Sequence, residues 1–230
     1  MLEHVYIFSD RVEAGRKLAV RLQHDPAIKE VSADQILLLS IPYGGVVVGA
    51  TAAEILGCAH DIIAAKKIKC PWCEQVIIGA VAEREVVSIS KSMMRDCLHH
   101  GKSTGSAIEQ AKAGVEDDIL KFRAGRSLDL ASKVVILVDD GIASGETIKA
   151  AIKWINSRAK LDRPRKLIVA VPICSNHIAT EMHQLSDQFI CLSMPSEFWT
   201  VGEFYWDFSQ VNDEMVRNHL TRWYALAATS

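Results

Sequence analysis

The chain has 230 residues, of which 49% are hydrophobic and 23% are charged, and its formal net charge is −2. This composition is typical of a folded globular protein, and the near-neutral charge favours neither a nucleic-acid nor a membrane partner. No apolar run reaches the length of a membrane span, the N-terminus does not read as a signal peptide, and the six cysteines are too scattered for a disulfide scaffold. We therefore expect one cytoplasmic domain that covers residues 1–230.

The first predicted elements are a helix and a buried strand. Asp10 is suited to cap a helix that runs to about Leu22, because its carboxylate can accept hydrogen bonds from the first free N–H groups. The aliphatic residues 36–41 (ILLLSI) predict a strand. The strand leads into residues 42–45 (PYGG) and an apolar helix over about residues 46–56. Adjacent glycines before a helix suit an anion site, although a tight turn favours the same residues.

Residues 61–65 (DIIAA) predict a short strand that ends at Lys66 and Lys67. A lysine pair is most often solvated, but the carboxyl ends of parallel strands converge on a ligand. The next segment, residues 70–73 (CPWC), has the spacing of a redox pair or of half a zinc site. No helix is predicted directly after it, and the other cysteines and histidines have no recognised metal spacing. We therefore expect these cysteines to be incidental. Residues 83–105 are polar and mixed.

The central segment combines a strand, two acids and a loop of small residues. Val134–Val138 are five consecutive aliphatic residues, as in a strand buried on both faces of a parallel sheet. Asp139 and Asp140 come directly after it, and residues 141–147 (GIASGET) lead into a helix. Such a loop presents backbone N–H groups at a helix N-terminus, which suits a phosphate. The two carboxylates suit sugar hydroxyls or a hydrated divalent cation.

The rest of the chain continues the alternation of strands and helices. Strands are predicted at residues 166–171 and 189–192, with Ser175 at the start of the helix between them. A C-terminal part from about residue 194 contains an aromatic segment, residues 198–208, and ends in a helix. This alternation predicts a doubly wound α/β fold. In that fold a parallel sheet carries helices on both faces and binds its ligand at the carboxyl ends of the strands.

Residues 136–147, ILVDDGIASGET, resemble the 5-phosphoribosyl-1-pyrophosphate (PRPP) motif of the type I phosphoribosyltransferases. That motif consists of apolar residues, two acids and a small-Thr/Ser-Gly-x-Thr loop. Gly141 stands where an apolar residue is commoner. Ala143 stands where the 6-oxopurine enzymes carry an Asp, which argues against a hypoxanthine or guanine substrate. Residues 8–15, 42–45 and 201–208 also resemble one subgroup of the family, whose members begin with Phe-x-Asp-Arg-x-x-Ala-Gly.

The resemblance implies a type I phosphoribosyltransferase fold, a doubly wound parallel sheet with a variable hood and a C-terminal helix at about residues 194–230. It implies transfer of the 5-phosphoribosyl group from PRPP to a nucleobase-like acceptor, release of pyrophosphate, and Mg²⁺ as cofactor. Asp139 and Asp140 would be the catalytic acids, which hold the ribose hydroxyls and contact the metal indirectly, through those hydroxyls or water. The 5-phosphate would be bound by Ala143, Ser144, Gly145, Glu146 and Thr147, and the pyrophosphate by Tyr43, Gly44, Gly45, Lys66 and Lys67.

Three further expectations follow from the resemblance. Tyr43 replaces the Arg of the subgroup's Pro-Arg-Gly-Gly, so one positive charge toward pyrophosphate is absent. Residues 83–105 correspond to a mobile loop that closes over the active site, although a plain connection is equally consistent with them. The aromatic residues 198–208 suit stacking on an acceptor base, but also packing on the core or on a second subunit, so a homodimer is compatible with the sequence.

Two other functions fit parts of the sequence. A regulator that binds PRPP or a nucleotide without turnover would tolerate the missing basic residue at Tyr43. A phosphoacceptor receiver domain also places paired acids at a strand end. Its acids, however, belong near the N-terminus of a chain about half as long, whereas Asp139 and Asp140 lie past the middle of this one. We therefore favour the transferase.

Overall fold

A computed structural model of the chain describes residues 7–98, 104–124 and 126–227. Its larger sheet is built from β1 (Ile36–Ser40), β2 (Ala59–Ile62), β6 (Val134–Val138), β7 (Lys166–Ile173) and β8 (Gln188–Ser193). The strand order is β2-β1-β6-β7-β8, and all neighbours run parallel. The predicted doubly wound parallel α/β fold is therefore confirmed.

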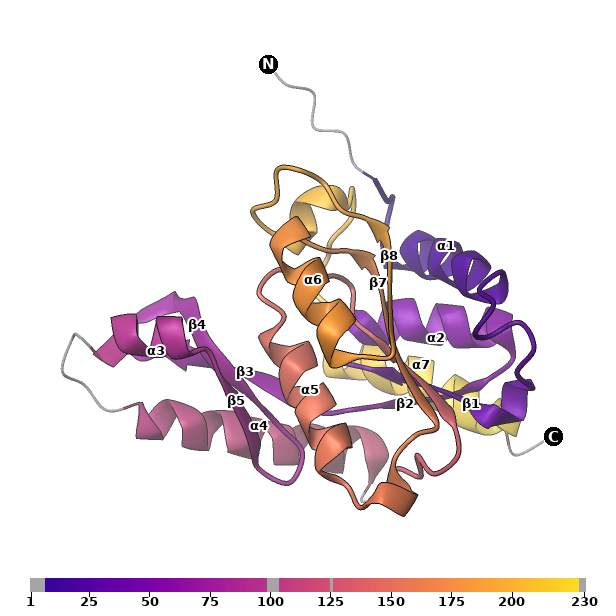
Figure 1. The fold of residues 1–230 in the computed structure, drawn as a ribbon, viewed down its shortest axis with the longest axis horizontal. Helices are drawn as coiled ribbons and strands as arrows, with labels where there is room; N and C mark the ends of the chain where they lie inside the picture. Colours follow the sequence, from indigo (N-terminus) through magenta and orange to yellow (C-terminus); the bar gives the residue numbers. More distant parts are fainter. Residues whose placement is uncertain (1–6, 99–103, 125, 228–230) are drawn as a thin grey trace.

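Helices cover both faces of this sheet (Figure 1). One face carries α1 (Arg11–Gln23) and α2 (Gly44–Leu56), with α7 (Asp213–Ala227) beside α2, and the other carries α5 (Glu146–Ser157) and α6 (Asn176–Leu185). The strands alternate between the two faces, as the two-residue period of a strand requires. Leu37 and Leu39 belong to the core under α5 and α6, whereas Leu38 belongs to the core under α1 and α2.

A second, antiparallel sheet extends to one side of the first (Figure 1). Its strands are β3 (Ala65–Cys70), β4 (Cys73–Ala82) and β5 (Val86–Ile89), and it packs with α3 (Lys91–Leu98) and α4 (Gly105–Arg123) around a core of its own. This corrects one prediction. The parallel strand β2 ends at Ile62, and Lys66 and Lys67 lie within β3, opposite Val81 and Ala80 of β4.

The C-terminal part crosses back to the start of the chain. Residues 194–212 contain the short 3-10 helix η3 (Val201–Phe204), and Tyr205 forms a parallel bridge with Phe8. Residues 83–98, the larger part of the predicted closing loop, form the β4–β5 turn, β5 and α3, while residues 99–103 lie outside the described ranges. Among the helices in the described ranges, none is long and apolar enough to cross a membrane.

Candidate active site

The two motifs of the sequence meet where the strand order of the larger sheet reverses. β1 and β6 are parallel neighbours, with β2 on the outer side of β1 and β7 and β8 on the outer side of β6. In open α/β sheets, ligands bind at this reversal, in the crevice at the carboxyl ends of the strands. Gly44 and Gly45 follow β1, and Asp139 and Asp140 follow β6.

Gly44 and Gly45 allow the backbone of α2 to approach both acids. A Cβ atom on Gly44 would collide with Oδ2 of Asp140, and one on Gly45 would lie 3.0 Å from Cα of Asp139. The helix begins at Gly44, two residues earlier than predicted, and no side chain caps it. Because the first N–H groups of a helix have no intrahelical acceptor, they are available to an anion at this edge.

The surroundings of Asp139 disfavour the negative charge of its carboxyl group. Its Oδ1 accepts a 2.9 Å hydrogen bond from the backbone N–H of Asp140. Desolvation of the carboxyl group, and then the neighbouring charge of Asp140, hold the pKa of Asp139 well above its usual range. The positive charge of Lys67 acts in the opposite direction. A cation or hydroxyl group that reached this carboxyl group would therefore favour its ionised form.

Asp140 is held by an arginine from the other end of the chain. The Nε atom of Arg11 lies 2.8 Å from Oδ2 of Asp140, and the two side chains are only 10% and 15% exposed. Arg11 also donates to the carbonyl of Ser209, at 2.9 Å, and its guanidinium carbon lies 3.7 Å from the ring centroid of Phe208. The hydroxyl of Tyr205 donates to the carbonyl of Asp140, at 2.6 Å.

The role of Arg11 was not predicted. The cap predicted at Asp10 is confirmed, since its carboxylate accepts from the N–H of Glu13, and a capped helix alone would place Arg11 on the surface. The sequence did contain one indication of this role. Residues 8–15 and 201–208 resemble a subgroup of the family that the central motif resembles, which suggests that these segments belong to one site. The structure joins those three segments through contacts at Asp140.

The predicted phosphate loop leads from Asp140 to the N-terminus of α5. Gly145 adopts a left-handed conformation, with φ of 74°, directly before the helix, and no side chain caps the helix. The hydroxyl of Ser175 does not cap α6 but donates to the carbonyl of Ala143, at 3.0 Å, which fixes the loop to the end of β7. Ser144 is exposed and Thr147 is partly exposed. The loop thus presents backbone N–H groups and two hydroxyls.

Glu146 offers this loop only its backbone. Its side chain is buried, and its carboxylate lies 3.0 Å from Nζ of Lys149. The same lysine pairs with Glu181 of α6 at 2.8 Å. Lys149 therefore compensates the negative charge of Glu146 on the side of α6. The backbone N–H group of Glu146 is the first of α5, and an anion is favoured at this end of a helix.

Two residues predicted for the pyrophosphate direct their side chains toward α4. The hydroxyl of Tyr43 lies 3.5 Å from Asp118, and its ring packs edge-on against Phe122 with centroids 5.8 Å apart. Burial, followed by the charge of Asp118, raises the pKa of Tyr43 above its usual value. Lys66 lies 2.7 Å from Asp118 and 4.8 Å from the centroid of the Tyr43 ring. Of the predicted lysine pair, only Lys67 is exposed and acts electrostatically on Asp139.

The aromatic segment 198–208 divides into buried and exposed rings. Phe204 and Tyr205 are buried, and Tyr205 packs against Phe8 and Phe208 with centroids 5.3 and 5.1 Å apart. Trp199 and Trp206 are 84% and 75% exposed. Gly202, Glu203 and residues 205–209 line a cavity of about 430 Å³ beside this cluster. Part of the segment thus packs on the core beside Asp139 and Asp140, which we call the acidic edge of the sheet, and part is exposed.

Gly141, the unusual residue of the central motif, lies beneath the C-terminal segment. A Cβ atom at this position would lie 2.6 Å from Cγ1 of Val201 and 2.5 Å from Cγ2 of Ile173. Such distances are too short for real carbon contacts, so a side chain at position 141 would push Val201 away from the sheet. The glycine therefore lets residues 201–205 pack directly over the acidic edge.

The fold and the site define a parallel α/β protein in which an acidic pair, a glycine turn and a phosphate-type loop share one edge. The chain belongs to the phosphoribosyl transferase domain family, whose model matches residues 10–209. It is 31% identical over 218 residues to two Mycobacterium tuberculosis proteins, from strains CDC 1551 / Oshkosh and ATCC 25618 / H37Rv, that are named provisionally as phosphoribosyl transferases. The match covers 94% of this chain and 47% of each relative, so the chain spans about half their length.

A solved structure has a similar fold. The crystal structure of TT1426 from Thermus thermophilus is similar with a TM-score of 0.72 and 28% sequence identity. The similarity covers 94% of this chain and 98% of that protein. The family predicted from the central motif is confirmed.

Proposed function

We propose that the chain transfers the 5-phosphoribosyl group from PRPP to a nucleobase-like acceptor and releases pyrophosphate. The observation that carries the proposal is the position of Asp139 and Asp140, between the Gly44-Gly45 turn and the uncapped N-terminus of α5. These three features match three parts of PRPP, namely its diol, its pyrophosphate and its 5-phosphate. Membership of the phosphoribosyl transferase domain family supports the same conclusion.

The residues of the site have separable tasks in this reaction. The loop from Ala143 to Thr147 binds the 5-phosphate through N–H groups and hydroxyls, and so fixes the ribose over the strand ends. The carboxylates of Asp139 and Asp140 orient the ribose hydroxyls. When the bond between the sugar and pyrophosphate breaks, positive charge develops on the ribose ring, and preorganised carboxylates beside the ring stabilise it. Gly44, Gly45 and Lys67 face the leaving group.

Magnesium fits the site as an ion that is bound together with the substrate. Carboxylate oxygens are ligands that Mg²⁺ prefers, and Asp139 and Asp140 supply them. Within the described ranges, however, no group of three or more His, Cys, Asp or Glu side chains is placed to hold a metal. The remaining ligands would be oxygen atoms of PRPP or water. When bound, the ion would neutralise charge on the pyrophosphate.

A PRPP- or nucleotide-binding regulator is the second candidate. Tyr43 and Lys66 are both engaged with Asp118 of α4, which removes two predicted partners from the pyrophosphate. A site that lacks cations for a leaving group can still bind ribose 5-phosphate through its loop and acids. The number of cations that act on pyrophosphate is therefore the point that separates enzyme from sensor.

The experiment is to measure pyrophosphate release from Mg²⁺-PRPP with purine, pyrimidine and pyridine bases. We expect release with at least one base, and its loss in Asp139→Asn. Asp34→Asn is the matched control, since Asp34 is an exposed acid that precedes β1 at the opposite edge of the sheet. A folded protein that binds PRPP but releases no pyrophosphate with any base would establish the regulatory function instead.

A further inference from the structure

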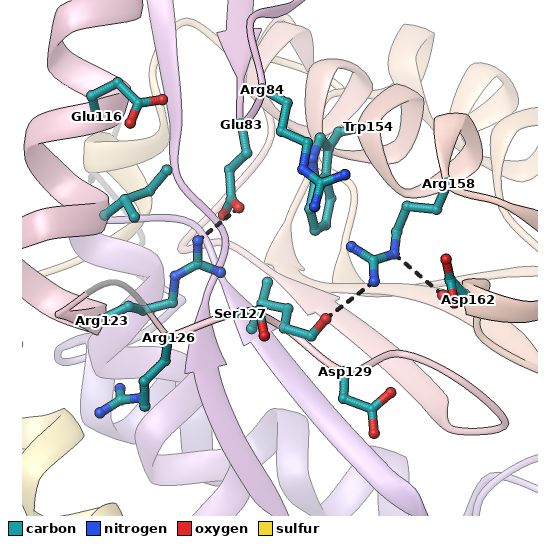
Figure 2. Close-up of a pocket in the computed structure, with 12 residues that line it drawn as sticks. Glu83, Arg84, Glu116, Arg123, Arg126, Ser127, Asp129, Trp154, Arg158 and Asp162 are labelled. Carbon is teal, nitrogen blue, oxygen red and sulfur yellow. Dashed lines mark hydrogen bonds and ion pairs between the residues drawn. The ribbon is translucent and has the colours of Figure 1, made fainter.

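A second cavity lies beside the far end of α5 (Figure 2). It has a volume of about 520 Å³ and is lined by the β4–β5 turn, α4, residues 126–129, the end of α5 and Asp162. The helix has 12 residues and rises about 1.5 Å per residue, so the cavity lies about 18 Å from the phosphate loop. A ligand at the acidic edge would not occupy it.

Arginine side chains converge on this cavity. Figure 2 shows Arg84, Arg123 and Arg158 directed toward one space, whereas Asp129 extends away from it. Glu116 and Asp162 also line the cavity. Glu83 is the carboxylate at that space, and it already binds Arg123 with an N–O distance of 2.7 Å. The whole lining contains four arginines and four carboxylates and is therefore balanced in charge. The case for an anionic occupant rests on the space where three guanidinium groups meet, because the carboxylate there, Glu83, is already paired.

Arg123 has hydrogen-bonding capacity that the described protein atoms do not use. The residue is 3% exposed, and its Nη2 atom binds Glu83. Within the described part of the chain, its Nε and Nη1 atoms are buried without a hydrogen-bond partner. Buried guanidinium N–H groups without an acceptor are strongly destabilising, so an acceptor is expected beside them. Glu83 already compensates the charge of Arg123, and an oxyanion would supply the acceptors that Nε and Nη1 lack.

Arg84 adds a second cation from a turn that is unusual for its sequence. Arg84 and Glu85 have φ of 52° and 57°, and the N–H of Val86 donates to the carbonyl of Glu83. Hairpin turns with two such residues ordinarily contain Asn and Gly. The neighbouring acids do not neutralise Arg84, since Glu83 binds Arg123 and Glu85 binds Lys112 at 2.9 Å.

Arg158 completes the arrangement from α5. Its Nε and Nη2 atoms donate to the carbonyls of Asp162 and Leu128, both at 3.2 Å, and its guanidinium lies 5.1 Å from the ring centroid of Trp154. These contacts orient the side chain without neutralising its charge. The three guanidinium groups thus come from three separate elements and approach from different directions.

We propose that this cavity is a second ligand site, which binds the phosphate group of a small metabolite. Donors that approach from several directions suit a tetrahedral phosphate better than a planar carboxylate, which one guanidinium fork can hold alone. The site is independent of the reaction proposed for the acidic edge.

The test is a titration of the full chain with inorganic phosphate. Binding is monitored through the ¹H–¹⁵N resonance of the Trp154 indole, and that resonance is assigned by its disappearance in Trp154→Phe. Trp154 lines the cavity, so the readout does not depend on phosphate bound elsewhere. We expect a saturable shift, and a weaker one with acetate at equal ionic strength. Arg84→Gly should weaken phosphate binding about tenfold or more, because it removes a charged hydrogen bond. It should not lower the melting temperature, because glycine relieves the left-handed turn.

Arg165→Ala is the matched control, because Arg165 is an exposed arginine directly before β7 that does not line the cavity. It should leave the titration unchanged, and so should Asp139→Asn, which alters only the acidic edge. No shift at Trp154, or an equal shift in wild type and Arg84→Gly, would overturn the proposal and assign the free N–H groups of Arg123 to water. An acetate response as strong as that to phosphate would overturn the preference for phosphate. All these outcomes are independent of pyrophosphate release.

Discussion

Replacing the two acids by asparagine, one at a time, should change stability in opposite directions. Asp140→Asn removes the charge that Arg11 binds at 2.8 Å in a nearly buried pair. Removing one partner of a buried ion pair costs about 3–5 kcal/mol. Asparagine still accepts a hydrogen bond, so we expect a loss of about 2–3 kcal/mol. In a chain of this size that loss lowers the melting temperature by about 5–10 °C.

Asp139→Asn should instead stabilise the protein at neutral pH. The pKa of Asp139 is raised in the folded state, so between the ordinary and the raised pKa the folded chain binds more protons than the unfolded chain. Stability contributed by this group therefore falls as pH rises through that window. Asparagine has no charge to suppress and can still accept from the N–H of Asp140. The advantage of the variant should disappear as the pH falls to the ordinary pKa of Asp.

The assay is urea and thermal unfolding of wild type and both variants, at neutral pH and near the ordinary pKa of Asp. Both variants should lose pyrophosphate release. The opposite changes in stability would then not be explained by a difference in activity between the two variants. Equal destabilisation by the two substitutions would refute the division between Asp139 and Asp140. A stabilising Asp140→Asn would show that Arg11 contributes nothing through its ion pair.

Three further substitutions test single contacts. Lys67→Ala should lower pyrophosphate release about tenfold, because it removes the cation that acts on Asp139, and steady-state kinetics that match wild type would contradict this. Gly141→Ala should cost about 1–3 kcal/mol in urea unfolding, because its Cβ would overlap Val201; an unchanged midpoint would show that the C-terminal segment yields freely. Tyr205→Phe should cost about 1 kcal/mol by the same measurement, since it removes a 2.6 Å hydrogen bond, and a neutral effect would mean that water replaces the hydroxyl.

The parts of the site that could be predicted from the sequence are those set by local chemistry. An aliphatic run such as Val134–Val138 forms a buried central strand because no other environment accommodates it. Gly44 and Gly45 could be singled out because adjacent glycines between a strand and a helix suit an anion site. The structure adds that a side chain at either position would collide with Asp139 or Asp140. Strand, turn and helix in fixed order then determine the edge of the sheet on which the motifs meet.

The parts that could not be predicted depend on contacts between distant segments. Arg11 and Asp140 are 129 positions apart, and no local pattern specifies their ion pair. The sequence did not predict the antiparallel sheet. The composition of β3 is compatible with a strand of the parallel sheet, and only its pairing with β4 shows that it belongs to another sheet. Lys66 was expected at the ligand, but Asp118 of α4 binds it. A lysine pair on a strand points to opposite faces of the sheet, and this alternation could have separated Lys66 from Lys67.

The contacts of Arg11 also decide how the acidic pair can serve a ligand. Arg11 occupies Oδ2 of Asp140, but an ionised carboxylate has two oxygens and several acceptor positions. In the proposed reaction the second oxygen can accept from a ribose hydroxyl, and the ion pair orients the carboxylate before a ligand arrives. No described residue forms such an ion pair with Asp139, and desolvation raises its pKa, so its charge forms most readily when positive charge develops beside it. In the proposed reaction the two acids, although adjacent in sequence, therefore have different tasks: Asp140 is oriented by Arg11, and the ionisation of Asp139 follows the ligand.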